Sequence, residues 1–503
     1  MRYIVNGSEM KEIDRQTINE IGITSMVLME RAAYSVYEEM TSYVHKDSRI
    51  LIVCGSGNNG ADGVALGRIL MQNGYGVTLY MIGNSEHYTV EMKSQTEIAS
   101  KIGLNMVNET NIAEYNVIVD AIFGIGLSRK VEGKYENIIN GINETDALKV
   151  AVDISSGINA SSGQVMGTAF KADMTVTFGA VKLGNIIYPG AEYSGKVITK
   201  DIGFPEQVIK SVAADRFITE DRDMLNILPR RKNDSNKGTF GKLLVVAGSK
   251  NMCGAAFLCA KAAYRMGTGL VRVFTTEKNR VIMQTLLPEA VLYTYDEETG
   301  TDSLENIMAQ SDCIVCGPGL GTGEMTEKLV GMVLDSGKKT VLDADALNQI
   351  NISDKLKEKY HENVVITPHV GEFSRLTGMS IRDIKMNPVE AAIQYAKNYK
   401  ITCVLKDART VTALPTGECY ININGNSGMA KGGSGDILAG TIGALMCQGM
   451  NPDMAAYSGV YIHGEAGDVA ADKYGQCGMN ATELAESLKR VMKKYENELK
   501  GNK

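Results

Sequence analysis

Short apolar runs alternate with helical patterns along most of the chain, and this alternation constrains the fold more than any other feature. The run Arg49–Cys54 is followed by a glycine-rich loop, a helical pattern over 61–74 and a second apolar run over 77–82. Two strands joined by one helix within about 30 residues lie parallel in one sheet. Further strands are predicted at 117–123, 150–153, 174–178 and 196–201. The first part of the chain is therefore predicted to be an α/β domain with a parallel sheet.

A second α/β series follows a polar, charged stretch at 213–237. It begins with an apolar run at 242–247, a helical pattern over 254–266 and an apolar run at 270–275. Later strands are predicted at 313–316, 340–343, 364–367 and 402–405, and an apolar helix over 437–446. We therefore predict two domains, residues 1–213 and 236–503, joined by a linker at 214–235.

Composition and charge exclude several classes of protein. The chain has 503 residues, and its 52 Lys and Arg against 59 Asp and Glu give a net charge of −7. Since nucleic-acid binding needs a basic surface, we expect no nucleic-acid partner. No apolar stretch approaches the roughly 18 residues of a membrane span, and the first residues lack the apolar core of a signal peptide, so we expect no membrane association. Nine scattered Cys are typical of a cytoplasmic protein, and a homo-oligomer is also expected.

The glycine-rich loop after the first predicted strand is a candidate phosphate site. Residues 55–60, Gly-Ser-Gly-Asn-Asn-Gly, match G-x-G-x-x-G between a strand and a helix. A dinucleotide fingerprint also needs an acidic residue at the end of the second strand, and the nearest one, Glu86, lies beyond that strand. The pattern alone therefore leaves two interpretations open, a phosphate-binding loop and a plain tight turn.

Polar side chains at the ends of neighbouring strands favour a ligand site. Asp120 lies in one strand run, just before a glycine-containing loop, and Asp153 ends another and is followed closely by Ser156. Open α/β sheets bind ligands at the carboxyl ends of their strands, although a single acidic residue there is often only a helix cap. Two such acids beside an Asn- and Gly-rich loop indicate a binding site.

The first 212 residues resemble the epimerases that act on hydrated NADH and NADPH. The resemblance is carried by Asn58-Asn-Gly-Ala-Asp62 after Gly57, by 120–127 (Asp-Ala-Ile-Phe-Gly-Ile-Gly-Leu), by 153–157 (Asp-Ile-Ser-Ser-Gly) and by 28–32 (Leu-Met-Glu-Arg-Ala). It implies a Rossmann-like three-layer fold and a catalytic Asp153 that also contacts the hydrated ring. It further implies a potassium ion held by Asn59, Asp120 and Ser156. The implied nucleotide-binding residues are Asn58, Asn59, Gly60, Ala61, Asp62, Gly124, Ile125, Gly126, Leu127, Ser128, Arg129, Lys130 and Asp153.

A glycine-rich loop in the second half precedes an apolar helix. Residues 425–436, Gly-Asn-Ser-Gly-Met-Ala-Lys-Gly-Gly-Ser-Gly-Asp, end with Asp436 in the first helical turn. Glycines at a helix start let backbone N–H groups surround an anion, whereas Asp in a first turn is also favoured by the helix dipole alone. No G-x-x-x-x-G-K-[ST] motif occurs, so a Walker-type site is excluded. The G-x-G-D ending resembles the ribokinase-like kinases, in which the Asp acts as a base.

Residues from about 224 to 500 resemble the nucleotide-dependent dehydratases that restore hydrated NAD(P)H. The matching segments are 237–241 (Lys-Gly-Thr-Phe-Gly), 317–321 (Gly-Pro-Gly-Leu-Gly), 343–347 (Asp-Ala-Asp-Ala-Leu), 367–372 (Thr-Pro-His-Val-Gly-Glu) and 406–410 (Lys-Asp-Ala-Arg-Thr). The resemblance implies a ribokinase-like α/β fold, Mg²⁺, and ADP as co-substrate. It implies a catalytic Asp436 and contacts of the hydrated nucleotide with Ala255, Gly319, Gly321, His369 and Asp436. The implied ADP- and AMP-binding residues are Lys406, Asp407, Ala408, Arg409, Thr410 and Gly435.

The two resemblances together predict a bifunctional repair enzyme for NADHX and NADPHX, the hydrated forms of NADH and NADPH. The first domain would interconvert their R and S epimers, and the second would dehydrate the S form at the expense of ADP. Two alternatives stay open: a ribokinase-type small-molecule kinase with an appended nucleotide-binding module, and an N-terminal half that binds without turnover. The acids Asp120 and Asp153 argue against the second alternative.

Overall fold

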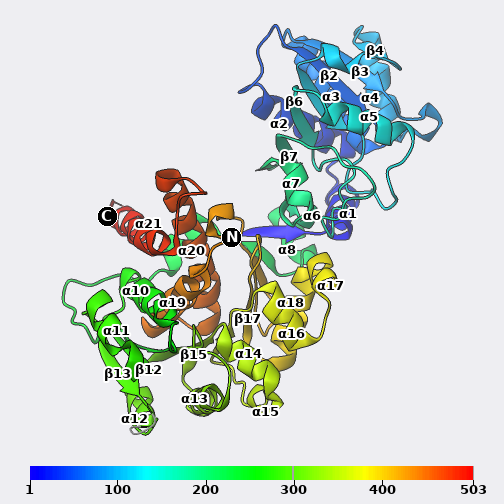
Figure 1. Cartoon of the computed structure of the whole chain (residues 1–503). Helices are drawn as coiled ribbons and strands as arrows, with labels where there is room; N and C mark the ends of the chain where they lie inside the picture. The colour runs from blue at the N-terminus through cyan, green and yellow to red at the C-terminus, as the bar shows by residue number, and fades with distance from the viewer. Residues whose placement is uncertain (297–299, 502–503) are drawn as a thin grey trace. The chain divides into compact units, whose positions relative to one another are not determined.

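The computed structural model describes residues 1–296 and 300–501, and it confirms the predicted α/β architecture (Figure 1). The chain forms two compact units, Arg2–Arg216 and Phe217–Lys503, with Met1 grouped with the second. The stretch 214–235, predicted as a linker, contains strand β10 (Arg216–Ile218) and helix α9 (Asp221–Ile227). Apolar and polar residues show no helix or strand periodicity there, so the sequence does not predict these two elements.

The N-terminal unit is built on a parallel sheet whose strand order reverses between β2 and β5. In spatial order its strands are β4 (Asn105–Val107), β3 (Gly76–Met81), β2 (Arg49–Cys54), β5 (Val117–Ala121), β6 (Leu148–Val152), β7 (Met174–Phe178) and β9 (Lys196–Lys200). All neighbouring strands pair in parallel. The chain runs from β2 outward to β4 and then returns to β5 on the other side of β2. Ligands of open parallel sheets bind at such a reversal.

Helices cover both faces of this sheet. Ile52 of β2 belongs to a core with Ala33 of α2 and Leu66 of α3, whereas Val53 belongs to a second core with Ile139 of α5. Successive residues of a strand point to opposite faces, so β2 supports both cores. The helices are α1 (Gly7–Gln16), α2 (Ser25–Met40), α3 (Asn58–Gln72), α4 (Val90–Lys101), α5 (Lys134–Asn143), α6 (Leu183–Ile186), α7 (Gly190–Ser194) and α8 (Glu206–Val212). A separate parallel pair joins β1 (Arg2–Val5) to β8 (Val181–Lys182).

The C-terminal unit is built on a parallel sheet with an antiparallel extension. Its parallel strands, in spatial order, are β13 (Val291–Tyr295), β12 (Leu270–Thr276), β11 (Lys242–Val246), β14 (Cys313–Cys316), β15 (Lys339–Leu342), β16 (Val364–Ile366) and β17 (Thr402–Leu405). Strands β18 (Val411–Ala413) and β19 (Cys419–Ile421) continue the sheet in antiparallel pairing. The strand order reverses between β11 and β14, which again marks a ligand-binding edge.

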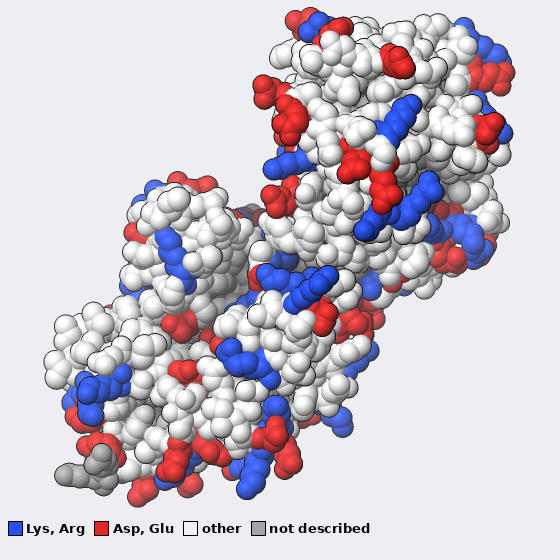
Figure 2. Space-filling view, turned by 45° about the vertical axis from the view of Figure 1, so that its right-hand side comes forward, with Lys and Arg blue, Asp and Glu red and all other residues white. Residues whose placement is uncertain are grey.

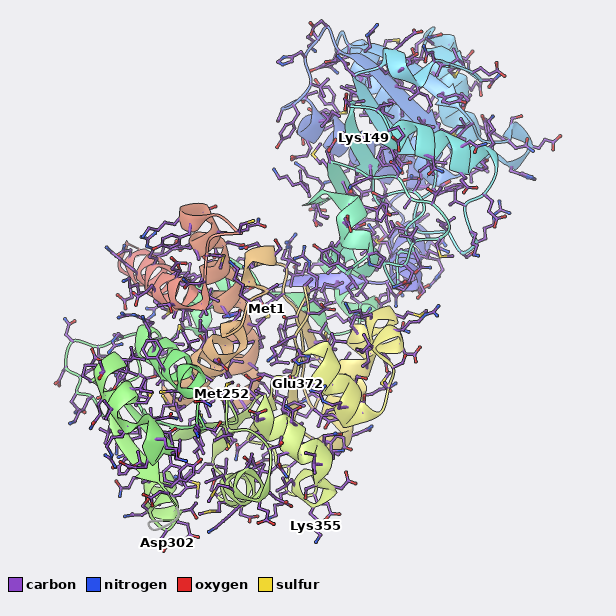
Figure 3. All side chains as sticks on the ribbon, viewed as in Figure 1. Met1, Lys149, Met252, Asp302, Lys355 and Glu372 are labelled. Atoms are coloured by element: carbon purple, nitrogen blue, oxygen red, sulfur yellow. The ribbon has the colours of Figure 1, made fainter. Side chains whose placement is uncertain are left out.

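One face of the C-terminal sheet is covered by α10, α19, α20 and α21. Leu243 and Val245 of β11 share a core with apolar side chains of these helices, including Ile442 and Leu488. Side chains fill the space between helices and sheet (Figure 3). The helices are α10 (Cys253–Arg265), α11 (Arg280–Leu286), α12 (Ser303–Ala309), α13 (Glu324–Asp335), α14 (Asp345–Ile352), α15 (Asp354–Lys357), α16 (Val370–Thr377), α17 (Ile381–Met386), α18 (Pro388–Tyr399), α19 (Ser434–Cys447), α20 (Pro452–Tyr474) and α21 (Ala481–Gly501).

The surface carries charges of both signs. Figure 2 shows basic and acidic side chains interspersed over the face that it draws. Among the described residues, no helix has both the length and the apolar composition that crossing a membrane requires.

Candidate functional site

The loop between β2 and α3 brings backbone N–H groups to the reversal point of the N-terminal sheet. Gly55 approaches the loop after β5 so closely that a Cβ atom there would lie 2.0 Å from the carbonyl oxygen of Ile122. Helix α3 begins at Asn58, and its N-cap residue, Gly57, provides no side-chain cap. The N–H groups of the first turn are therefore free of a capping side chain, as a phosphate-binding helix start requires.

Asp120 and Ser156, two of the predicted potassium ligands, lie in contact. Asp120 is fully buried at the end of β5, where its Oδ1 accepts a hydrogen bond from the Ser156 hydroxyl at 2.6 Å and its Oδ2 accepts one from the Ser156 N–H at 2.7 Å. The N–H of Ile122 also donates to Oδ1, at 3.1 Å. Burial raises the pKa of Asp120 to about 6, although these hydrogen bonds oppose the rise. Neutral donors therefore surround this carboxylate.

Asn59, the third predicted potassium ligand, lies against the loop after β5. A Cβ atom on Gly124 would be 3.3 Å from the Cβ of Asn59. The side-chain nitrogen of Asn59 is buried without a hydrogen-bond partner among the described residues. A half-turn of the Asn59 side-chain amide exchanges its nitrogen and oxygen. The same position can therefore present an oxygen to a cation.

Asp153 has an unusual backbone conformation and forms an ion pair with a buried lysine. Its backbone φ is +68°, a region that non-glycine residues rarely adopt and that often marks functional residues. Lys182, whose side chain is 1% exposed, forms an ion pair with Asp153 Oδ1 at 2.5 Å. The hydroxyl of Thr177 and the N–H of Phe178 also donate to that oxygen, each at 3.1 Å. Sequence reasoning missed Lys182, although a charged residue inside the apolar run 174–187 was an available signal.

A cavity of about 190 Å³ lies at this edge of the N-terminal sheet. Six of the predicted nucleotide-binding residues line it: Asn58, Asn59, Asp62, Gly124, Ile125 and Asp153. Lys182 and Asp14, which the sequence analysis did not select, also line it. Pockets that enclose a whole drug-sized ligand typically measure about 300–1,000 Å³, so this cavity has room for one ring of a larger molecule.

The remaining predicted residues of this site lie outside the cavity lining. Gly60 and Ala61 are buried within the first turn of α3. Leu127 is half-buried, and Gly126, Ser128, Arg129 and Lys130 are exposed on the loop that follows β5. The two exposed cations are chemically suited to the phosphates of a ligand whose ring occupies the cavity.

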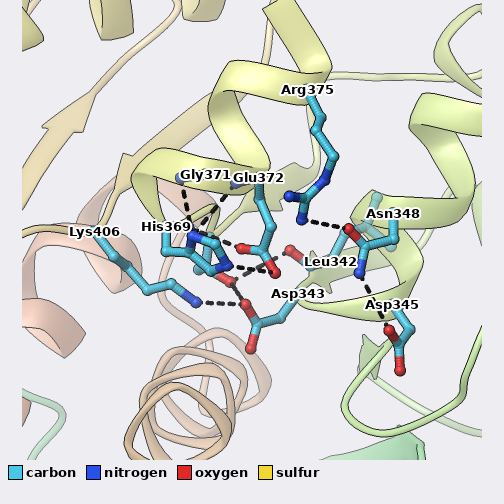
Figure 4. Close-up of polar contacts among 10 residues, drawn as sticks. Leu342, Asp343, Asp345, Asn348, His369, Gly371, Glu372, Arg375 and Lys406 are labelled. Atoms are coloured by element: carbon cyan, nitrogen blue, oxygen red, sulfur yellow. Dashed lines mark hydrogen bonds and ion pairs between the residues drawn. The ribbon is translucent and has the colours of Figure 1, made fainter. Parts of the chain in front are cut away.

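In the C-terminal unit, Asp343 and Lys406 form an ion pair at the carboxyl ends of β15 and β17 (Figure 4). The Lys406 nitrogen lies 2.7 Å from Asp343 Oδ1, which also accepts a hydrogen bond from the Thr367 hydroxyl at 2.8 Å. Burial lowers the pKa of Lys406. The negative charges of Asp343 and Glu372 have a larger, opposite effect, so the pKa of Lys406 lies above its ordinary value. Lys406 therefore stays a cation, as a phosphate-binding group must.

The glycine-rich loop brings Asp436 next to this ion pair. A Cβ atom on Gly435 would lie 3.2 Å from the Lys406 nitrogen and 3.7 Å from Asp343 Oδ2. Asp436 lies in the first turn of α19. Burial and the negative charge of Asp343 raise the pKa of Asp436 to about 7, against the opposing effect of Lys406. A carboxylate with a pKa near neutrality is suited to accept a proton during catalysis.

His369 caps a helix as well as facing the site. Its ring Nδ1 accepts hydrogen bonds from the N–H groups of Gly371 and Glu372, and Glu372 Oε2 accepts one from the His369 N–H (Figure 4). Because Nδ1 accepts, the ring proton belongs on Nε2, and the neutral ring can donate from that atom. The side chain is 55% exposed, so this donor can reach a ligand.

The predicted residues Ala255, Gly319 and Gly321 lie along the neighbouring strand ends. Gly319 has a φ of +63°, and a Cβ atom there would lie 3.0 Å from the Cβ of Ala255. The Gly321 N–H donates to Asp345 Oδ2 at 2.8 Å. The structure thus brings Ala255, in the first turn of α10, next to Gly319, on the loop after β14.

The predicted nucleotide-binding segment 406–410 forms the turn between β17 and β18. Asp407 and Ala408 are exposed, and Arg409 donates a hydrogen bond to the Ile423 carbonyl at 2.8 Å. The Thr410 hydroxyl donates to the Asp407 carbonyl at 3.3 Å.

His463 is a further residue that sequence reasoning missed. Its Nε2 lies 3.0 Å from the carbonyl oxygen of Ser434, in the first turn of α19, which also carries Asp436. Burial lowers the pKa of His463 to about 4, so the ring is neutral at physiological pH and its Nε2–H can donate to that carbonyl. Nothing near His463 in the sequence indicates this contact, which joins α20 to the start of α19.

Comparisons with known proteins match both halves of the chain. The family model for NAD(P)H-hydrate dehydratase matches residues 243–490, and the model for the YjeF-related protein N-terminus matches residues 25–184. The bifunctional NAD(P)H-hydrate repair enzyme of Thermofilum pendens is 37% identical over 97% of this chain and 95% of its own length.

Solved structures resemble about half of the chain. A ribokinase-like superfamily protein from Enterococcus faecalis superposes with a TM-score of 0.51 at 30% identity, covering 56% of this chain and 96% of that one. The ADP/ATP-dependent NAD(P)H-hydrate dehydratase of Bacillus subtilis, co-crystallised with ATP and Mg²⁺, gives a TM-score of 0.49 at 31% identity, covering 55% and 98%.

Proposed function

The chain belongs to the family of bifunctional NAD(P)H-hydrate repair enzymes. On this premise we propose that its N-terminal unit epimerises NADHX and NADPHX and that its C-terminal unit dehydrates the S epimer. The observation that carries the proposal is that each unit places a carboxylate, Asp153 or Asp436, at the ligand-binding edge of its own sheet. The family assignment does not favour the alternative of a ribokinase-type small-molecule kinase.

We assign epimerisation to the cavity that Asp153 lines. The substrate carries a hydroxyl on the ring carbon next to the ring nitrogen, and inversion requires that centre to open and re-form from the other face. Asp153 is placed to exchange a proton with the reacting oxygen, and Lys182 fixes its orientation. The first-turn N–H groups of α3 and the cations Arg129 and Lys130 would bind the phosphates outside the cavity.

Potassium fits the buried group of Asp120, Ser156 and Asn59. Asp120 is a buried carboxylate bonded to neutral donors, and Asn59 provides a buried amide without a partner among the described residues. Hard cations prefer oxygen ligands of this kind. A potassium ion bound there would offset the charge of Asp120 and order the two loops beside the cavity.

Replacing Asp120 by Ala should weaken epimerisation and its response to potassium. The change removes one oxygen ligand and leaves the Ser156 N–H without its acceptor, at a cost to stability of about 1–3 kcal/mol. Epimerisation is measured in potassium and in choline salts, with Asp146→Ala, an exposed acid of the same unit, as the control. Equal stimulation of Asp120→Ala and the control by potassium would contradict the assignment.

We assign dehydration to the group around Asp436. Asp436 accepts the proton of the substrate hydroxyl while that oxygen takes the terminal phosphoryl group of ADP, which leaves AMP. The ring nitrogen lone pair then expels phosphate, and loss of a proton from the adjacent ring carbon restores the dihydropyridine. The Lys406 ammonium and the N–H groups at the start of α19 would stabilise the phosphoryl group in transit.

Magnesium enters this proposal as part of the nucleotide substrate. Mg²⁺ is usually held by one or two carboxylates together with the substrate phosphates. Among the described residues, no cluster of three His, Cys, Asp or Glu side chains could hold a metal by itself. We therefore propose MgADP as the co-substrate, with the segment 406–410 and Gly435 as its binding residues.

A fragment of residues 1–216 should interconvert the epimers without any adenine nucleotide. The hydrophobic cores of the N-terminal unit consist of its own residues. Arg216 forms an ion pair with Glu9 of α1, and the fragment retains that contact. Epimer interconversion is followed by chromatographic separation of the R and S forms. A folded fragment that leaves the epimer ratio unchanged would overturn the assignment of epimerisation to this unit.

A further inference from the structure

Four ionisable side chains line the N-terminal cavity in the part of the chain that the structure describes. Asp14 comes from α1, Asp62 from α3, Asp153 from the end of β6 and Lys182 from β8. Three acids thus share the cavity with one cation, and their environments differ.

The cation, Lys182, forms an ion pair with one of the three acids, Asp153. The Lys182 ammonium has three N–H donors, and its acceptors are Asp153 Oδ1 at 2.5 Å, the Thr177 hydroxyl at 3.1 Å and the Phe178 carbonyl at 2.9 Å. The Asp153 carboxylate therefore lies beside a fixed cation. Lys182 makes no such bond to the other two acids.

Asp14 and Asp62 face the cavity without a cation of their own. Within residues 1–296 and 300–501, neither carboxyl has a hydrogen-bond or ion-pair partner. Burial raises the pKa of Asp62 well above its ordinary value, and the negative charges of Asp153 and Asp14 raise it further, against Lys182. Burial also raises the pKa of Asp14 to about 7, where Lys182 lowers it and Asp153 raises it. The surroundings of Asp62 therefore favour its protonated form.

This inference rests on the epimerase function proposed above. We propose that Asp62 is the general acid of epimerisation, that Asp153 is its base partner, and that Asp14 is a positioning residue for Asp62 in the same cavity. The proposal divides acid and base roles between carboxyls in different environments, one unpaired and one paired with lysine. Two titratable groups held in opposite protonation states are a common basis for such a division.

The proposed step conserves atoms and electrons. Asp62 gives its proton to the ring hydroxyl, the carbon–oxygen bond breaks, and the ring nitrogen lone pair forms a carbon–nitrogen double bond as water leaves. Water then attacks the same carbon from the other face and gives a proton to Asp153, while the carbon–nitrogen π electrons return to nitrogen. Transfer of that proton from Asp153 to Asp62 through cavity water restores the enzyme.

The test measures epimerisation against pH in the full chain, after subtraction of the non-enzymatic rate. Asp62→Asn should lose about 10²–10⁴-fold in rate, and Asp62→Glu, which restores a carboxyl, should recover part of it. Asp14→Asn should move the alkaline limb of the profile to lower pH by about one unit, because a negative charge beside Asp62 is removed. Asp146→Asn, an exposed acid of the same unit, should match the wild type.

Two results would overturn the proposal. One is an Asp62→Asn variant with the wild-type rate, and the other is an Asp14→Asn variant whose alkaline limb coincides with that of the wild type. The Asp14 result decides the matter if Asp62→Asn fails to fold. A wild-type chain that does not epimerise NADHX would instead refute the underlying function, so the two failures are distinguishable.

Discussion

The Asp436→Asn variant is expected to lose dehydration almost completely and to keep epimerisation. Asn has nearly the size of Asp and can occupy the first turn of α19, so the fold should change by about 1 kcal/mol or less. What the variant loses is an atom that can accept the proton of the substrate hydroxyl. Loss of a general base typically reduces a rate by about 10²–10⁴-fold. NADH recovery from the S epimer with MgADP measures the effect.

The pH dependence of dehydration by the wild-type enzyme is a second test of the role of Asp436. Because the pKa of Asp436 is about 7 and a base acts in its deprotonated form, kcat/KM for dehydration should rise with pH up to about 7 and then level off. The matched control is Asp354→Asn, which changes an exposed acid in the first turn of α15. Near-normal NADH recovery by a folded Asp436→Asn enzyme would contradict the role of Asp436.

The Asp153→Asn variant should show the opposite pattern, with epimerisation lost and dehydration intact. Asn is one of the few residues that tolerate a positive φ, so the backbone at φ +68° can persist. The amide oxygen can still accept hydrogen bonds from Thr177 and Phe178, but the negative charge beside Lys182 is gone. We expect a rate loss of about 10²–10⁴-fold in epimer interconversion.

Chromatography of the two epimers during turnover measures this prediction. With MgADP present, Asp153→Asn should consume the S form and leave the R form to disappear only at its non-enzymatic rate. Asp146→Asn serves as the control in the same unit. Consumption of the R form at the wild-type rate by Asp153→Asn would remove Asp153 from the mechanism.

The sequence was sufficient to predict the sheets and the loops at their carboxyl ends. Apolar runs such as Arg49–Cys54 are long enough to be recognised as strands, and a parallel sheet places the residues that follow them at one edge. Asp120 and Ser156 could therefore be expected to meet, and they do so through hydrogen bonds. Strands of only two or three residues, such as β8 and β4, escaped recognition.

Residues that reach a site from distant segments could not be predicted in the same way. Asp14 lies on a helix far from the other cavity residues in sequence, and only the packing of α1 brings it there. His463 is buried in the middle of α20, where its spacing resembles that of a core residue. The protonation state of a carboxyl also depends on its ion-pair partners, and Lys182 pairs with Asp153 and not with Asp62. Such pairings are properties of the folded chain.

The most direct test of the central claim is to incubate a mixture of R and S NADHX with the wild-type chain and to follow the return of dihydronicotinamide absorbance. Parallel samples contain MgADP, MgATP or no nucleotide. A bifunctional repair enzyme converts both epimers, so absorbance should return fully with the productive nucleotide and not at all without one. The Asp153→Asn chain should rapidly recover only the S fraction. A stable phosphorylated product in place of NADH, or recovery of the S fraction alone by the wild type, would contradict the assignment.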